Sequence, residues 1–173
     1  MPKVNENYSM QYTCYISIGS NLGDRVINCE KAMKKLESFA TILSTSSFYE
    51  TEPWGYEDNQ HYINAVLKLE TPLSSYDFLY ELKMIEISMG RLKKQREVVY
   101  ESRIIDLDIL FFDDIIIHNE KLIIPHPKLH DRQYVLIPFV EIEPNFICPS
   151  TNKRIIDLFR QCKDLSRVFL YTH

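Results

Sequence analysis

The distribution of apolar residues along the chain predicts alternating strands and helices. Apolar and polar residues alternate through residues 14–18, which predicts a short strand. An apolar stripe with roughly helical spacing follows and predicts a helix; its members are Ile27, Cys29, Ala32, Met33, Leu36 and Phe39. Two strands are expected around residues 42–50 and 64–70. The polar and aromatic segment between them, residues 51–62, is expected to be a long functional loop.

A second helix is predicted to begin near Ser74, because Ser74 and Asp77 have the spacing of a capping box. One face of this helix is apolar, and it consists of Phe78, Leu82, Ile85 and Met89. Gly90 is expected to end the helix. Residues 103–112 are rich in β-branched and aromatic residues and predict a third major strand.

The resulting order of elements is β-α-β-β-α-β, which predicts a mixed α/β (α+β) fold of the ferredoxin-like type. A hairpin at residues 115–125 and a C-terminal helix at residues 154–165 are expected additions. We expect one domain over residues 12–173, with residues 1–11 as a loose tail.

Composition narrows the class of protein. The chain of 173 residues is 45% hydrophobic and 25% charged, as in soluble globular proteins. Its net charge of −4 argues against a nucleic-acid binder, and no apolar run is long enough to cross a membrane. The four cysteines lack a C-x-x-C pair, which fits reduced thiols and a cytoplasmic protein; they are Cys14, Cys29, Cys148 and Cys162.

Two acidic residues interrupt the strand predicted at residues 103–112. Because side chains alternate along a strand, Asp106 and Asp108 should share one face, roughly 7 Å apart. Two neighbouring carboxylates in an apolar strand repel one another unless a cation neutralises them, and Mg²⁺ bridged to substrate phosphates is the favoured ion. Arg103 just upstream would also suit phosphate charge. The alternative is a solvated strand face with two surface acids.

Seven landmarks occur in one order with compatible spacings. They are Ile18-Gly19-Ser20-Asn21-Leu22-Gly23, Ser47-Phe48-Tyr49-Glu50-Thr51-Glu52-Pro53-Trp54-Gly55, Tyr62-Ile63-Asn64-Ala65, Glu86 with Gly90-Arg91, Arg103-x-x-Asp106-Leu107-Asp108-Ile109-Leu110, Pro125-His126-Pro127 and Arg132-Gln133-Tyr134-Val135-Leu136. Together they closely resemble the 6-hydroxymethyl-7,8-dihydropterin pyrophosphokinases of folate biosynthesis, over residues 15–149.

The resemblance implies transfer of a pyrophosphoryl group from ATP to the hydroxymethyl oxygen of the pterin, with release of AMP. It implies two Mg²⁺ ions held by Asp106 and Asp108, with Arg91 and Arg103 as catalytic contacts to the phosphates. It further implies a set of ATP-binding residues, namely Glu86, Lys93, His126 and Arg132. A pterin site is implied by Thr51, Tyr62, Asn64 and Tyr134, with Gly19 and Asn21 at its floor.

Physical chemistry agrees with the implied pterin site. Tyr62 and Tyr134 could stack on the two faces of a flat ring, while Asn64 could pair with its polar edge. Without the resemblance, both tyrosines would be read as ordinary half-buried strand residues.

Residues 92–102 join the two arginines assigned to phosphates, Arg91 and Arg103. We expect this segment to be a lid that orders when ATP, Mg²⁺ and pterin are all bound. Two other functions remain open from the residues alone: a non-catalytic ferredoxin-like module that binds a small ligand or RNA, and a two-metal phosphodiesterase or nuclease. The sequence identifies no protein partner.

Overall fold

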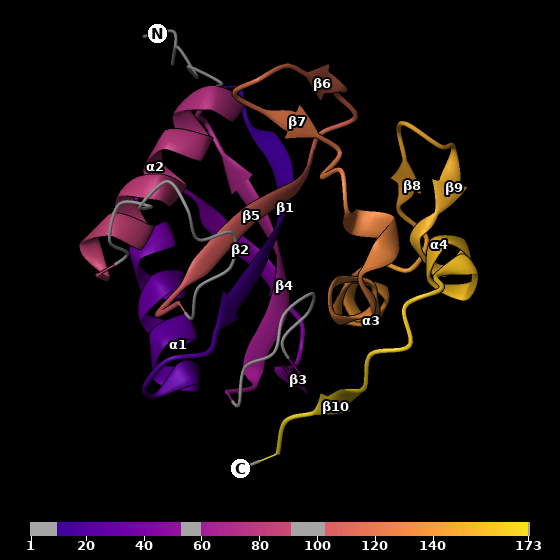
Figure 1. Cartoon of the computed structure of the whole chain (residues 1–173). Helices are drawn as coiled ribbons and strands as arrows, with labels where there is room; N and C mark the ends of the chain where they lie inside the picture. Colours follow the sequence, from indigo (N-terminus) through magenta and orange to yellow (C-terminus); the bar gives the residue numbers. More distant parts are fainter. Residues whose placement is uncertain (1–9, 53–59, 91–102, 173) are drawn as a thin grey trace, which may run out of the picture.

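The computed structural model describes residues 10–52, 60–90 and 103–172. Its centre is an antiparallel sheet with the order β10-β3-β4-β1-β5, in which β2 also pairs with β4 (Figure 1). The strands are β1 (Tyr12–Ser20), β2 (Thr41–Thr45), β3 (Tyr49–Thr51), β4 (Tyr62–Thr71), β5 (Asp106–Phe112) and β10 (Val168–Leu170).

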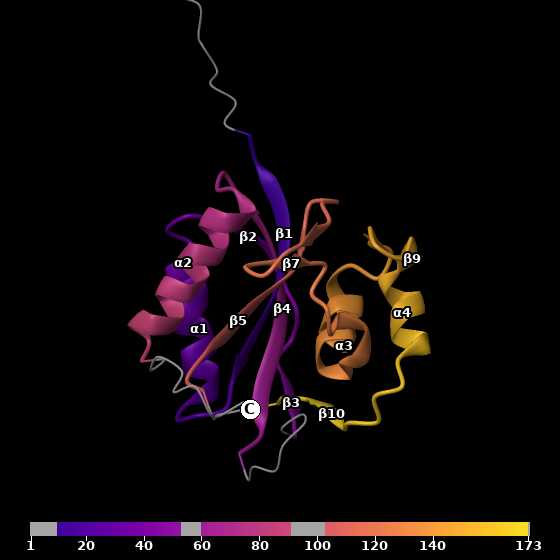
Figure 2. The ribbon, with the colours of Figure 1, turned by 45° about the horizontal axis from the view of Figure 1, so that its top comes forward.

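Helices lie on both faces of the sheet. Two of them, α1 (Arg25–Leu36) and α2 (Ser75–Ser88), cover one face, and α3 (Gln133–Ile142) lies on the other with α4 (Ile155–Gln161) outside it (Figure 2). The smaller elements are two hairpins, β6 (Ile117–His118) with β7 (Ile123–Ile124) and β8 (Ile147–Cys148) with β9 (Lys153–Arg154), and a 3₁₀ turn, Leu129–Asp131.

The chain order β1-α1-β2/β3-β4-α2-β5 and the antiparallel pairing of β1 between β4 and β5 confirm the ferredoxin-like prediction. The predicted hairpin at residues 115–125 is present as β6 and β7. None of the described helices is both long and apolar enough to cross a membrane.

Alternation along the strands divides the core into two layers. Ile16 and Ile18 of β1 belong to the layer packed against α1 and α2, whereas Tyr15 belongs to the layer packed against α3. The second layer is aromatic: the ring centroids of Tyr15 and Phe139 are 4.8 Å apart, and those of Tyr15 and Phe146 are also 4.8 Å apart. Both faces of the sheet are therefore anchored by well-packed apolar side chains.

The two predicted helices form, with one error in the apolar stripe of the first. Ile27 is 43% exposed, and the buried residues of α1 are Val26, Cys29, Ala32 and Leu36. Asp24 caps this helix, since its side chain accepts a hydrogen bond from the Ile27 backbone N–H. The cap fixes where the helix begins, and the buried stripe starts one residue earlier than the sequence pattern indicated.

Ser74 caps α2, as its position in the sequence predicted. Its hydroxyl accepts a hydrogen bond from the backbone N–H of Asp77 at 3.3 Å and donates one to Asp77 Oδ2 at 2.6 Å. Gly90 follows the helix with φ of +102°, a conformation that favours glycine.

The single strand expected at residues 42–50 is two strands, β2 and β3, which both pair with β4. Ser46 lies between them and replaces the regular ladder with its own bonds. Its backbone N–H donates to the carbonyl of Val66 at 3.0 Å, and its hydroxyl accepts from the Val66 N–H at 3.0 Å. The Ser46 hydroxyl thus takes the place of a backbone acceptor where β2 ends and β3 has not yet begun.

The C-terminal helix expected at residues 154–165 is shorter, ending at Gln161. Cys162 is already extended, and Asp164 beyond it accepts a hydrogen bond from the Gln133 backbone N–H at 2.9 Å. Helix α3 is not predicted by the sequence pattern, because its interior includes Pro138, a residue that usually disfavours helix. In both places tertiary contacts override the local pattern.

All four cysteines are free thiols, and Cys14, Cys29 and Cys148 are buried. Burial raises the pKa of Cys29 to about 12, and the charge of Glu30 acts in the same direction. These thiols are therefore part of the apolar core.

Replacing Phe139 with alanine should destabilise the protein by about 3–5 kcal/mol, because a fully buried ring is removed from the aromatic layer under α3. Urea unfolding at neutral pH measures this loss. Phe169→Ala is the control, since Phe169 is 56% exposed and should change stability by no more than about 0.5 kcal/mol. Equal effects of the two substitutions would mean that α3 does not pack as described.

Candidate active site

Asp106 and Asp108 lie on the same face of β5, as predicted. In the register with β1, Asp106 is opposite Gly19 and Asp108 is opposite Ser17. The side chains of the two acids are 25% and 32% exposed. They are on the α3 side of the sheet, because Leu110, two residues further along β5, packs in the core layer against α3.

The apolar core covers only part of the sheet face that carries the acid pair. Tyr15 of β1, Val66 of β4 and Phe111 of β5 are buried in the core layer under α3. Towards the opposite end of the strands, polar residues replace them. The fold thus places an apolar layer and a polar site on one face of the same sheet.

Arg103 is held beside the acid pair by both its side chain and its backbone. Its Nη1 donates to Asp106 Oδ1 at 2.8 Å. Its backbone N–H donates to Asn21 Oδ1 at 2.6 Å, and its carbonyl accepts from the Asn21 N–H at 3.1 Å. Burial alone would lower the pKa of Arg103, but Asp106, with Tyr62 and Asp108, outweighs burial and raises the pKa. The guanidinium therefore stays charged next to Asp106.

His126 faces Asp108 with a defined ring nitrogen. Its Nδ1 accepts a hydrogen bond from the Lys128 backbone N–H at 3.1 Å, so its Nε2 is the nitrogen that lies 3.9 Å from Asp108 Oδ2. Burial lowers the pKa of His126; Asp108 opposes this effect, and Arg132 adds to it. A neutral imidazole with its proton on Nε2 fits these contacts.

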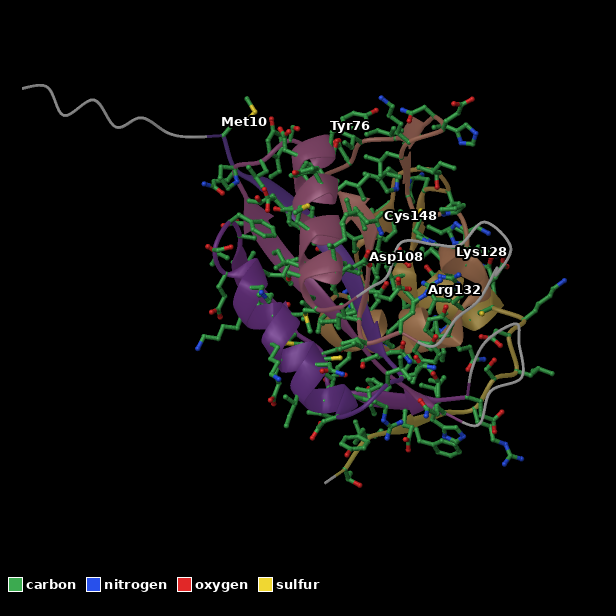
Figure 3. The ribbon with its side chains drawn as sticks, turned by 60° about the vertical axis from the view of Figure 1, so that its left-hand side comes forward. Met10, Tyr76, Asp108, Lys128, Arg132 and Cys148 are labelled. Atoms are coloured by element: carbon green, nitrogen blue, oxygen red, sulfur yellow. The ribbon has the colours of Figure 1, made fainter. Side chains whose placement is uncertain are left out.

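Arg132 and Tyr134 come from the start of α3. Arg132 is the N-cap residue, and its guanidinium carbon lies 5.6 Å from the ring centroid of Tyr134. Burial raises the pKa of Tyr134. The charge of Arg132 lowers this pKa, whereas the charges of Asp108 and Asp106 raise it. Figure 3 shows Asp108 and Arg132 in the same region of the molecule. The start of α3 therefore adds a second guanidinium and an aromatic ring to the site.

Four of the residues predicted for the pterin lie together where β1 and β3 end and β4 begins. Asn64 Nδ2 donates to Thr51 Oγ1 at 2.8 Å, and Asn64 is directly opposite Gly19. A Cβ atom on Gly19 would lie 2.9 Å from Asn64 Oδ1 and 3.8 Å from the ring of Tyr62. Glycine is therefore required for the observed position of the asparagine side chain.

The structure does not bring Glu86 into this open group. Glu86 is 1% exposed on α2, and it accepts hydrogen bonds from the Leu107 N–H at 2.8 Å and from Lys83 Nζ at 3.1 Å. Arg91, Lys93 and the proposed lid at residues 92–102 lie outside the described residues. Within the described ranges, no three His, Cys, Asp or Glu side chains are grouped so that they could hold a metal ion.

Two acids that anchor α3 were missed from the sequence. Glu141 accepts hydrogen bonds from the backbone and hydroxyl of Ser47 and from the hydroxyl of Tyr49. Asp164 accepts from the Gln133 N–H at the first residue of α3. Both contacts span long sequence separations, so no local signal could have revealed them. They fix the helix whose start carries Arg132.

Arg25 is a further residue that the sequence did not single out. Its Nη1 donates to Glu50 Oε1 at 2.7 Å and to the His61 carbonyl at 2.8 Å. Glu50 and His61 directly precede Thr51 and Tyr62, so Arg25 links the ends of β3 and β4 at the predicted pterin residues. A polar cavity of about 530 Å³ adjoins this link; it is lined by Asn21, Gly23, Arg25, Glu50, Gln60 and His61.

A ferredoxin-like sheet that carries paired carboxylates, two guanidinium groups and a histidine at one end has the equipment of enzymes that handle phosphate groups. Comparison with known proteins identifies the kind of enzyme. Residues 15–144 match the model of the family described as 7,8-dihydro-6-hydroxymethylpterin-pyrophosphokinase (HPPK). The chain belongs to this family.

Relatives of several sizes are similar to the chain. The 2-amino-4-hydroxy-6-hydroxymethyldihydropteridine pyrophosphokinase of Haemophilus influenzae is 39% identical over 154 residues, which cover 88% of this chain and 94% of that protein. The folic acid synthesis protein FOL1 of Dictyostelium discoideum is 38% identical over 148 residues, which cover 83% of this chain and 22% of that protein.

Solved structures share the fold at lower identity. A crystal structure of Plasmodium falciparum HPPK-DHPS A437G with pteroate has a TM-score of 0.73 and 18% identity. The match covers 90% of this chain and 41% of the solved chain. The chain thus spans less than half of these solved proteins, and a fifth of the Dictyostelium relative, but nearly all of the bacterial enzyme.

Asn21→Ala should release Arg103, because the partly buried amide of Arg103 loses its acceptor. We expect a loss of about 1–3 kcal/mol in stability and faster hydrogen exchange at the Arg103 amide. Asn28→Ala is the matched control, since Asn28 braces the same turn through the Leu22 carbonyl without contacting Arg103. Unchanged exchange at Arg103 in the Asn21 variant would contradict the bridge.

Proposed function

We propose that the site around Asp106 and Asp108 is where this member of the family transfers a pyrophosphoryl group from ATP to the hydroxymethyl oxygen of 6-hydroxymethyl-7,8-dihydropterin. The products are the pterin pyrophosphate and AMP, and the reaction belongs to folate biosynthesis. The observation that carries the placement is the pair of carboxylates on one face of β5 with Arg103 bonded to one of them. Family membership disfavours the two alternatives, a non-catalytic module and a phosphodiesterase.

Two Mg²⁺ ions fit the donor chemistry of this site. The two partly exposed carboxylates offer hard oxygen ligands, and no thiol belongs to the described group around them. Two side chains are too few to enclose an ion, which suits Mg²⁺ because it retains waters and takes phosphate oxygens as ligands. Bound Mg²⁺ would neutralise the triphosphate and stabilise charge that develops at the β-phosphorus.

The side chains around the acid pair would align the triphosphate. Arg103 is already charged and fixed by Asn21, so it can donate to a phosphate at little cost in reorganisation. Arg132, at the start of α3, lies in the same region as Asp108 (Figure 3). The Nε2–H of His126 points toward the acid pair, where it can donate to a phosphate oxygen. Arg91 and Lys93 stay predictions from the family resemblance for phosphate or nucleotide contacts.

The pterin would lie over Gly19, between the sheet and the start of α3. Asn64 is held by Thr51 and can present its amide to the polar edge of the ring. Tyr62 and Tyr134 would supply the stacking faces. The hydroxymethyl group would then be directed toward the acid pair, because Asp106 is the neighbour of Gly19 on the other side of β1 from Asn64.

Product analysis tests the proposed reaction. The purified protein should convert ATP, Mg²⁺ and 6-hydroxymethyl-7,8-dihydropterin into AMP and a pyrophosphorylated pterin in equal amounts. It should release no AMP when the pterin is omitted. ADP as the nucleotide product, or ATP hydrolysis without pterin, would contradict the proposal.

Asp106→Asn and Asp108→Asn should each abolish most turnover, because each removes a negatively charged metal ligand. Pterin affinity should be less affected, since the pterin contacts other residues. Steady-state rates at ordinary Mg²⁺ and pterin titration by fluorescence measure the two effects. Asp114→Asn, an exposed acid just beyond β5, is the control and should retain normal turnover. Near-normal rates in either active-site variant would refute the metal assignment.

Tyr134→Ala should weaken pterin binding by about 1–3 kcal/mol, the scale of one aromatic stack and its buried area. ATP binding should change little, and Tyr134→Phe should bind pterin nearly as well as the wild type. Calorimetric titration with each ligand measures the difference. Equal losses of affinity for ATP and pterin in Tyr134→Ala would show that the ring has no stacking role.

A further inference from the structure

Glu86 is the only charged side chain that is buried in the described part of the chain. It projects from α2 toward the edge strand of the sheet, and it accepts a hydrogen bond from the backbone N–H of Leu107 at 2.8 Å through Oε1. Its other oxygen, Oε2, accepts from Lys83 Nζ at 3.1 Å. Burying a carboxylate is costly, so this placement calls for a reason.

Leu107 is the residue between the two acids. It pairs with Ile18 of β1 and is fully buried, and β5 is the edge strand of the sheet among the described residues. In an antiparallel pair, residues with outward-facing backbone groups alternate with residues bonded to the partner strand. The Leu107 N–H faces outward to Glu86, and without an acceptor it would be a buried, unsatisfied donor.

We propose that Glu86 is a positioning residue for the metal-binding acids: by holding the Leu107 N–H, it fixes the peptide that joins Asp106 to Leu107 and thereby sets how Asp106 and Asp108 are presented. The proposal rests on the proposed role of the two acids as Mg²⁺ ligands. It gives Glu86 a structural role in catalysis in place of a direct contact with ATP.

Two observations favour positioning over direct ligation. Both oxygens of Glu86 already have protein donors, and these donors come from α2 and from the outer edge of β5. Glu86 also does not group with Asp106 and Asp108 into a cluster of three potential metal ligands among the described residues. The carboxylate therefore acts on the acid pair through the backbone of β5.

Two conservative substitutions separate the effect of the length of the Glu86 side chain from the effect of its charge. Glu86→Asp keeps the charge but withdraws the oxygen by one methylene, so the Leu107 N–H should lose its acceptor. Glu86→Gln removes the charge but keeps an oxygen at the same reach. Lys83→Met is the control, because it removes the ion pair and leaves the bond to Leu107.

Two readouts decide the outcome. The first is hydrogen exchange at the Leu107 amide in the ligand-free protein, which should accelerate in Glu86→Asp and stay near wild type in Glu86→Gln and Lys83→Met. The second is the Mg²⁺ concentration that gives half-maximal pyrophosphoryl transfer at saturating substrates. It should rise by about tenfold in Glu86→Asp, as for other residues that orient metal ligands, and by no more than about twofold in the other two variants.

The opposite order, with Glu86→Gln impaired and Glu86→Asp near normal, would show that charge matters and would overturn the proposal. An unchanged Mg²⁺ midpoint in Glu86→Asp, with a faster Leu107 amide, would also overturn it. Failure of the proposed function itself gives a different result, since the wild-type protein would then form no pterin pyrophosphate from ATP. If Glu86→Asp does not fold, Glu86→Met takes its place, because it removes the acceptor of the Leu107 N–H. The Leu107 amide should then exchange faster and the Mg²⁺ midpoint should rise, and an unchanged midpoint would refute the proposal.

Discussion

Mutual repulsion between Asp106 and Asp108 is the constraint around which this end of the sheet is organised. The period of two along β5 puts both carboxylates on one face, and the pairing with β1 fixes them opposite Gly19 and Ser17. Two negative charges on one strand face are tolerable because guanidinium groups and a histidine N–H lie beside them. Arg103 bonds to Asp106, His126 faces Asp108, and Arg132 approaches from α3.

The remainder of the fold serves to hold these groups from three directions. The turn after β1 supplies Asn21, which bonds to both backbone groups of Arg103. The aromatic layer under α3 fixes that helix against the sheet, and Glu141 and Asp164 tie it at its two ends. On the far side of β5, α2 contributes Glu86. An apolar core on both faces of the sheet thus supports the polar groups of the site.

Much of this arrangement could be predicted from local patterns in the sequence. The acid pair was found because strand periodicity and charge repulsion both act over two residues, and the Ser74 cap was found because it depends on residues three apart. The role of Glu86 could not be read in this way, since it depends on an edge strand that follows α2 by some twenty residues of chain. The role of Arg25 could not be predicted for the same reason, because its partners, Glu50 and His61, come together only when β3 pairs with β4. The helix α3 was missed because Pro138 disfavours helix locally, although Val135, Leu136 and Phe139 have the spacing of a buried helical face.

Calorimetric titration with a non-transferable ATP analogue tests the central claim most directly, because it reports on ligand binding at the acid pair before any chemistry occurs. With Mg²⁺ present, the analogue should bind at least about tenfold more tightly than in EDTA, and 6-hydroxymethyl-7,8-dihydropterin should then bind to the same complex. That result would show a site completed by metal and phosphate together. Equal affinity for the analogue with Mg²⁺ and with EDTA would contradict the account, since the two carboxylates would then repel the triphosphate rather than hold it through a cation.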